Sequence, residues 1–218
     1  MKQHTLIWDM DGTLVDSYPA IVPAVREVLS GFGLELPEEE IHRAVIQSSV
    51  RAFLDQTAAL RGLDAAALQA AFARLNDSRI ESILPMPHAR ETLAALRRAG
   101  HLSFVYTHRG ASCPAILEQT GLAPYFTEVV GALAGFPRKP APDAILYLMG
   151  KYGLDPARCW YVGDRSLDLE AAANAGIGCF LYLEPSAPGR PDGRASFLIR
   201  DLLEIPALLE QHMRPEAD

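Results

Sequence analysis

The sequence predicts an α/β fold, a parallel sheet core with a helical domain inserted into it. Two patterns lead to this prediction. Short apolar runs alternate with helical segments over most of the chain, which is the rhythm of a parallel sheet covered by helices. Residues 17–83 break that rhythm, because their apolar side chains recur at helical spacing and show no strand pattern.

The strands of the sheet are expected where apolar residues run without interruption, as is typical of strands buried on both faces. The first run, residues 6–8, comes directly before a pair of aspartates. Later strands are expected at 102–106, 128–130, 159–162, 177–183 and 197–199. A loop rich in Pro, Gly and Ser at 184–194 and a closing helix complete the core.

The insert is expected to be helical throughout. Glycine, proline and aspartate divide residues 17–83 into about four helices, with Pro37 suited to a first helical turn and Asp64 to an N-cap. A single leading strand cannot form a sheet by itself, so the segments on either side of the insert must share one domain. The predicted organisation is a core of residues 1–16 and 84–218 and a helical domain of residues 17–83.

The composition argues against several classes of protein. With 20 basic and 27 acidic residues among 218, the formal net charge is −7, which disfavours a general nucleic-acid or anionic-membrane surface. Three cysteines without a CxxC pair favour a reducing compartment. The early first strand leaves no room for a signal peptide, and no apolar run approaches a membrane span. We therefore expect a cytoplasmic protein, and a monomer because no apolar stripe exceeds what core packing needs.

The most informative segment follows the first strand, where Asp9 and Asp11 stand with one residue between them. In α/β sheets ligands bind beyond the carboxyl ends of the strands, and two close carboxylates need a cation or a proton to coexist. A divalent metal ion meets that need. An isolated pair of this kind is more often a loop or capping feature, so its weight comes from the residues around it.

The eight residues 9–16, Asp-Met-Asp-Gly-Thr-Leu-Val-Asp, are similar to the first motif of the haloacid dehalogenase (HAD) superfamily, most of whose members are magnesium-dependent phosphatases. The layout of the chain resembles the HAD core with a helical cap, as in the phosphoglycolate phosphatase and β-phosphoglucomutase group. The resemblance implies a three-layer, Rossmann-like core with residues 17–83 as the cap. It implies that Asp9 attacks phosphorus to form an aspartyl-phosphate and that Asp11 is the general acid and base. Both would also bind the metal ion, Asp11 through its backbone carbonyl.

Two further segments resemble the motifs that surround the phosphoryl group in this superfamily. Thr107, at the end of a predicted strand, takes the position of a hydroxyl that grips phosphoryl oxygens, and His108 and Arg109 after it are candidates for substrate contact. Lys139 precedes a proline-started helix and resembles the lysine that offsets the charge of nucleophile and phosphate. The chain has only three lysines, so a lysine at this position is informative.

A fourth segment, residues 161–168, places Asp164 just past a strand and Asp168 four residues later. Ser166 is suited to be the N-cap of the following helix, which sets Asp168 in the first turn. The resemblance implies that Asp164 is a direct metal ligand and that Asp168 is a direct or water-mediated one. With the carboxylates of the first motif they form an all-oxygen site, which suits Mg²⁺.

Individual residues of the chain discriminate between the activities known in the superfamily. Haloacid dehalogenases lack the second aspartate of the first motif, so Asp11 argues against that activity. Phosphonoacetaldehyde hydrolase uses a cap lysine as a Schiff-base amine, and residues 17–83 contain no lysine, which argues against that activity too. The resemblance therefore implies a phosphatase for a small phosphorylated metabolite, such as phosphoglycolate or a sugar phosphate. A β-phosphoglucomutase-like phosphomutase is left open, with Arg51 at the position of a contact to the distal phosphate. A catalytically silent binding module would have lost a motif residue, and none is lost.

Overall fold

The computed structural model describes residues 3–183 and 193–212, so the loop expected at 184–194 lies mostly outside the described residues. The chain divides into two compact units, one made of Met1–Val15 with Pro85–Asp218 and the other of Asp16–Leu84. The sequence places the domain boundaries after residues 16 and 83, one residue away from this division at each end.

The first unit is built on a parallel sheet. Within the described residues it has six strands in the order β5-β4-β1-β6-β7-β8, and every neighbouring pair is parallel. The strands are β1 (Thr5–Trp8), β4 (Leu102–Tyr106), β5 (Val129–Val130), β6 (Cys159–Gly163), β7 (Gly178–Tyr182) and β8 (Phe197–Ile199). Each lies on one of the predicted apolar runs, and the predicted α/β fold class is confirmed.

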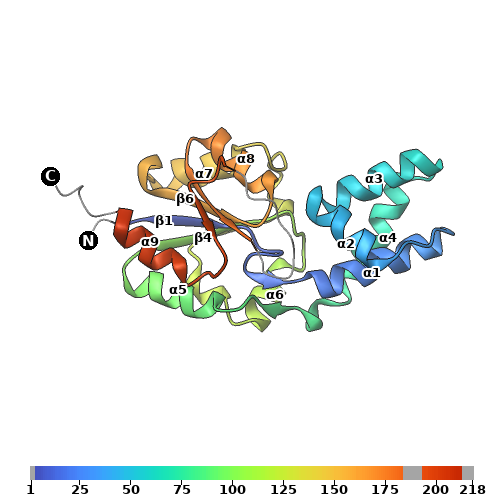
Figure 1. The fold of residues 1–218 in the computed structure, drawn as a ribbon, viewed down its shortest axis with the longest axis horizontal. Helices are drawn as coiled ribbons and strands as arrows, with labels where there is room; N and C mark the ends of the chain where they lie inside the picture. The colour runs from blue at the N-terminus through green and yellow to red at the C-terminus, as the bar shows by residue number, and fades with distance from the viewer. Residues whose placement is uncertain (1–2, 184–192, 213–218) are drawn as a thin grey trace. The chain divides into compact units, whose positions relative to one another are not determined.

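Helices cover both faces of this sheet. They are α5 (Ala89–Arg98), α6 (Cys113–Gln119), α7 (Asp143–Tyr152), α8 (Ser166–Ala175) and α9 (Glu204–His212). Figure 1 shows α7 and α8 on one face and α5 and α9 on the other, which gives three layers. Under α7 and α8 the core joins helix and strand side chains that are 2% exposed or less: Ile145 and Leu169 with Ile7, Phe104 and Tyr161.

The second unit is helical, as the spacing of its apolar residues predicts. Its helices are α1 (Tyr18–Gly31), α2 (Glu38–Gln47), α3 (Val50–Arg61) and α4 (Ala65–Asp77). They enclose a core of their own, which includes the buried side chains of Val25, Ile41 and Leu54. Asp64 caps α4 as predicted, because its carboxylate accepts hydrogen bonds from two backbone N–H groups of the first turn. Pro37 is the N-cap of α2 and not, as expected, a residue of its first turn.

The chain passes between the two units at two short strands that the sequence analysis did not predict. These are β2 (Val15–Asp16) and β3 (Leu84–Pro85), which pair in a two-stranded sheet. A strand of two residues is too short to produce a period-2 pattern, so hydrophobic patterning cannot detect it.

The strand order brings several of the predicted site residues to one edge of the sheet. The strands β4, β1 and β6 are neighbours, so Thr107, Asp9 and Asp164, which follow them, emerge at the same edge. None of the helices in residues 3–183 and 193–212 combines the length and apolar character needed to cross a membrane.

Candidate active site

Asp9 opens the site directly after β1. Its backbone N–H donates to the carbonyl oxygen of Val162 on β6 at 2.8 Å, and the residue is 1% exposed. The chain then turns sharply, and Gly12 takes a φ of +82°, a left-handed conformation that favours glycine. The segment therefore sets one carboxylate at the buried edge of the sheet and a second, that of Asp11, in the turn beyond it.

Lys139 joins two carboxylates that come from different elements. Its Nζ donates to Asp9 Oδ1 at 2.7 Å and to Asp168 Oδ1 at 2.6 Å. It also donates to the hydroxyl oxygen of Tyr161 at 3.0 Å. The three charged side chains are 2% exposed or less, and charges buried to this extent require partners of opposite sign.

These contacts set the protonation states of the cluster. Burial by itself would raise the pKa of Asp9, but the positive charges of Lys139 and Arg165 outweigh it and hold the pKa below its ordinary value. Burial and the neighbouring charge of Asp9 raise the pKa of Asp168. Burial opposes the charge on Lys139, yet the two aspartates raise its pKa overall. At neutral pH, Asp9 is therefore an ionised carboxylate held against an ammonium group.

The turn from β6 into α8 positions Asp168. Helix α8 begins at Ser166, and the Asp168 carboxylate accepts a hydrogen bond from the backbone N–H of Arg165 at 3.2 Å. The N-cap is Arg165, so the expectation for Ser166 was wrong by one residue: the cap is supplied by the third helical residue and not by the N-cap side chain. Gly163 permits this close approach, since a Cβ there would lie 2.4 Å from Asp168 Cβ.

Asp11 is paired with Arg109. The guanidinium donates from Nε to Asp11 Oδ1 at 3.0 Å and to Oδ2 at 3.1 Å, and from Nη2 to Oδ1 at 2.5 Å. The arginine side chain is 3% exposed and that of the aspartate 21%, so Asp11 is reached by solvent more readily than Asp9. Charge-assisted contacts of this geometry fix the direction of a carboxylate.

Thr107 and His108 organise the end of β4. The Thr107 hydroxyl accepts a hydrogen bond from the backbone N–H of Arg109 at 3.1 Å. His108 Nε2 accepts one from the backbone N–H of Lys139 at 2.8 Å, which requires that nitrogen to be unprotonated. Burial, followed by the positive charges of Lys139 and Arg138, lowers the pKa of His108 to about 2. His108 is thus a neutral ring that holds the backbone at Lys139.

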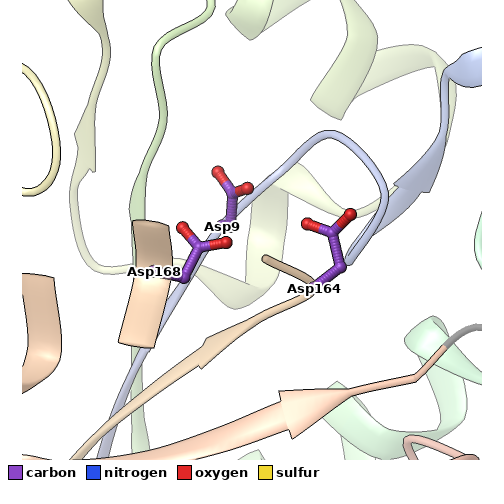
Figure 2. A group of neighbouring side chains, drawn as sticks. All are labelled: Asp9, Asp164 and Asp168. Carbon is purple, nitrogen blue, oxygen red and sulfur yellow. The ribbon is translucent and has the colours of Figure 1, made fainter. Parts of the chain in front are cut away.

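Three carboxylates form a group that could hold a metal ion. Figure 2 shows Asp9, Asp164 and Asp168, and one carboxylate oxygen of each lies within 4.8 Å of the others. Carboxylate oxygens are the hard donors that Mg²⁺ prefers, so the donor set fits that ion. Both Asp168 oxygens already accept protein hydrogen bonds, one from Lys139 and one from the Arg165 backbone.

The structure therefore gathers most of the residues predicted for the site on one edge of the first unit. These are Asp9, Asp11, Thr107, His108, Arg109, Lys139, Asp164 and Asp168. Arg51 belongs to the second unit, where its exposed side chain forms an ion pair with Asp55 on the same helix.

Two residues of the cluster escaped the sequence analysis. Arg165 lies 3.4 Å from Asp9 Oδ2 and 3.7 Å from Asp164 Oδ1, and Tyr161 supports the ammonium of Lys139. Arg165 stands between two predicted metal ligands in the sequence, and that position was a usable signal for it. Tyr161 carried no such signal, because a tyrosine in a buried strand is usually a residue of the hydrophobic core.

The cluster thus combines buried carboxylates with cationic side chains. Comparison with known proteins identifies the family of the chain. The family described as haloacid dehalogenase-like hydrolase matches residues 6–182. That span covers most of the chain, and the protein belongs to this family of hydrolases.

Individual relatives agree with this placement. The protein is 30% identical to a phosphoglycolate phosphatase of Vibrio parahaemolyticus, over 93% of this chain and 96% of the relative. Among solved structures, it is 25% identical to a hydrolase from Pseudomonas syringae, with a TM-score of 0.77 over 96% of this chain and 99% of that one. A structure described as a predicted phosphoglycolate phosphatase from Haemophilus somnus shares the fold, with a TM-score of 0.80 at 23% identity and coverage of 96% and 99%.

Proposed function

We propose that the protein is a Mg²⁺-dependent phosphatase that hydrolyses a small phosphorylated metabolite through an aspartyl-phosphate intermediate. The observation that carries the proposal is the buried contact of Asp9 with Lys139, beside two further carboxylates of an all-oxygen group. An ionised carboxylate on the edge of a sheet, next to cations that can offset phosphate charge, is the arrangement that phosphoryl transfer needs. Family membership supports the same reaction class.

In the first step, an Asp9 carboxylate oxygen attacks phosphorus and the bond to the substrate oxygen breaks. The leaving oxygen takes a proton from the Asp11 carboxyl group. In the second step, water attacks the phosphorus of the aspartyl-phosphate, its proton passes to Asp11, and inorganic phosphate and free Asp9 are released. Asp11 is suited to both proton transfers because it stands in the turn beyond Asp9 and is partly exposed.

Positive charge around the phosphoryl group comes from the protein and from the metal ion. We assign the ion to Asp9, Asp164, Asp168 and the backbone carbonyl of Asp11; when bound, it neutralises charge on the phosphoryl oxygens. When all four carboxylates are ionised, the three cationic side chains here leave one net negative charge, which a divalent ion would reverse. The hydroxyl of Thr107 is assigned to a phosphoryl oxygen.

We infer the substrate class from the similarity to the relatives. The similarity to phosphoglycolate phosphatases supports phosphoglycolate or a compound of similar size, with the helical unit acting as a cap that selects the leaving group. We expect a cytoplasmic enzyme that acts as a monomer. The three free and buried cysteines suit a reducing compartment.

The proposal is tested by phosphate release from a panel of metabolite phosphates with Mg²⁺ or with EDTA. The panel includes phosphoglycolate, and β-glucose-1-phosphate is followed in parallel for glucose-6-phosphate. Strong release from one compound, lost in EDTA, is the expected result. Isomerisation without net release would identify a phosphomutase, and no reaction with any compound would favour a binding module.

A further inference from the structure

The side chain of Arg165 bridges two carboxylates that are candidates for the metal site. Its Nη2 lies 3.4 Å from Asp9 Oδ2, and its Nε lies 3.7 Å from Asp164 Oδ1. The side chain is 11% exposed, and the two carboxylates are 2% and 7% exposed. One guanidinium therefore lies beside two carboxylates that follow different strands, β1 and β6.

Lys139 plays a different part on the other side of Asp9. It contacts Oδ1 of Asp9 and Oδ1 of Asp168, is fully buried, and is held further by Tyr161. The two cations thus divide the oxygens of Asp9 between them. Arg165 contacts both Asp9 and Asp164, whereas Lys139 contacts Asp9 and Asp168.

We propose that Arg165 is a displaceable counter-ion of the metal site, which holds Asp9 and Asp164 in the metal-free protein and moves away when a divalent cation binds. The inference rests on the metal site of the proposed function. A guanidinium and a divalent cation cannot both lie between the same two carboxylates, since their charges repel. Arginine keeps its proton at any physiological pH, so the repulsion is relieved only by movement of the side chain.

This exchange has a measurable consequence for metal affinity. The free energy of the two broken ion pairs is subtracted from that of metal binding, so the apparent affinity for Mg²⁺ is lower than the carboxylates alone would give. Removal of the guanidinium should tighten Mg²⁺ binding. In the absence of metal, the same change leaves Asp9 and Asp164 with less compensation and should destabilise the fold.

The test is calorimetric titration of the full-length protein with MgCl₂, without substrate. Arg165→Ser is the main variant, because serine is a favourable N-cap residue and the Arg165 backbone N–H that Asp168 accepts from is kept. We expect it to bind Mg²⁺ about tenfold more tightly, or more, than wild type. Arg158→Ser is the matched control: it removes one partly exposed arginine paired with Asp155, and its Mg²⁺ affinity should equal that of wild type.

Thermal unfolding gives a second readout. In EDTA, Arg165→Ser should unfold at a lower temperature than wild type, and added Mg²⁺ should raise its unfolding temperature by more. Arg165→Gln, which keeps a long polar side chain without the charge, should behave in the same way. If the serine variant does not fold, Arg165→Gln still tests whether loss of the positive charge changes Mg²⁺ binding and stability.

Equal or weaker Mg²⁺ binding by both neutral variants would overturn the inference. If wild type still released phosphate in a Mg²⁺-dependent reaction, the proposed function would stand without it. Conversely, tighter Mg²⁺ binding by the variants, together with no phosphate release from any substrate, would support the counter-ion and contradict the phosphatase.

Discussion

At the scale of single residues, the site depends on one buried cation between two buried carboxylates. Lys139→Ala would remove the cation that contacts both Asp9 and Asp168, and would leave Arg165 as the cation in contact with Asp9. Breaking a buried pair of this kind costs about 3–5 kcal/mol of folding free energy, and loss of one preorganised electrostatic partner costs about 3–4 kcal/mol of transition-state stabilisation. Urea denaturation and kcat/KM for phosphate release measure the two losses.

Lys151→Ala is the matched control for this prediction. Its ammonium also contacts a carboxylate, that of Glu128, but its side chain is 45% exposed. The free energy of unfolding should change by no more than about 0.5 kcal/mol, and kcat/KM should not change. If Lys139→Ala proved as mild as Lys151→Ala in both assays, the buried ammonium would not have the role given to it here.

At the scale of elements, His108 ties the end of β4 to the segment that carries Lys139. The folded protein holds His108 neutral with a pKa lowered to about 2, whereas the unfolded chain binds a proton below about pH 6.5. The unfolded state therefore takes up more protons as the pH falls, and stability decreases below pH 6.5. The predicted loss from this residue is about 1.4 kcal/mol at pH 5.5, measured by urea denaturation at pH 7.5 and 5.5.

His108→Gln isolates this contribution, because a glutamine oxygen can accept the same backbone hydrogen bond but does not titrate. The variant should lose less stability between the two pH values than wild type does. Burial also lowers the pKa of His101, so both proteins should keep some acid sensitivity. An identical pH dependence in the two proteins would show that His108 is not held neutral by the fold.

Hydrophobic patterning predicts the longer elements of this protein but not the shortest ones. The strands of the parallel sheet are buried on both faces, so they appear in the sequence as apolar runs, and each was placed to within a residue or two. The two-residue strands β2 and β3 carry no such signal. The N-cap at Arg165 was missed because Ser166 has the better intrinsic preference, while the actual cap comes from Asp168 inside the helix.

Motif spacing placed the candidate site residues, but it could not give their partners. The contacts of Arg109 with Asp11 and of Arg165 with Asp9 join residues 98 and 156 positions apart. Such pairs depend on strand order and on the turns after each strand, which no local pattern contains. The contact that makes His108 an acceptor for a backbone N–H is hidden for the same reason.

At the scale of the whole molecule, each of the two units has its own hydrophobic core. Leu54→Ala, at a side chain 1% exposed in the helical unit, should destabilise that unit by about 2–5 kcal/mol. Amide hydrogen exchange should accelerate in α1–α4 while β1, β4 and β6 keep their protection. Leu60→Ala on the same helix is the control, since that leucine is 76% exposed and its loss should cost less than about 0.5 kcal/mol.

Faster exchange in the sheet as well, after Leu54→Ala, would mean that the two units unfold as one cooperative structure. Protection that stays unchanged in the helices would mean that this core does not stabilise them. Either result would contradict the description of two units with separate cores.

In the proposed reaction, Asp9 is the nucleophile of a Mg²⁺-dependent phosphatase. The most direct test is phosphate release by Asp9→Asn and by wild type, each with saturating Mg²⁺ and the best substrate of the panel. Asparagine keeps the size of the side chain but lacks the carboxylate that attacks phosphorus. For Asp9→Asn we expect phosphate release no faster than in the reaction without enzyme. Turnover by Asp9→Asn close to that of wild type would contradict it.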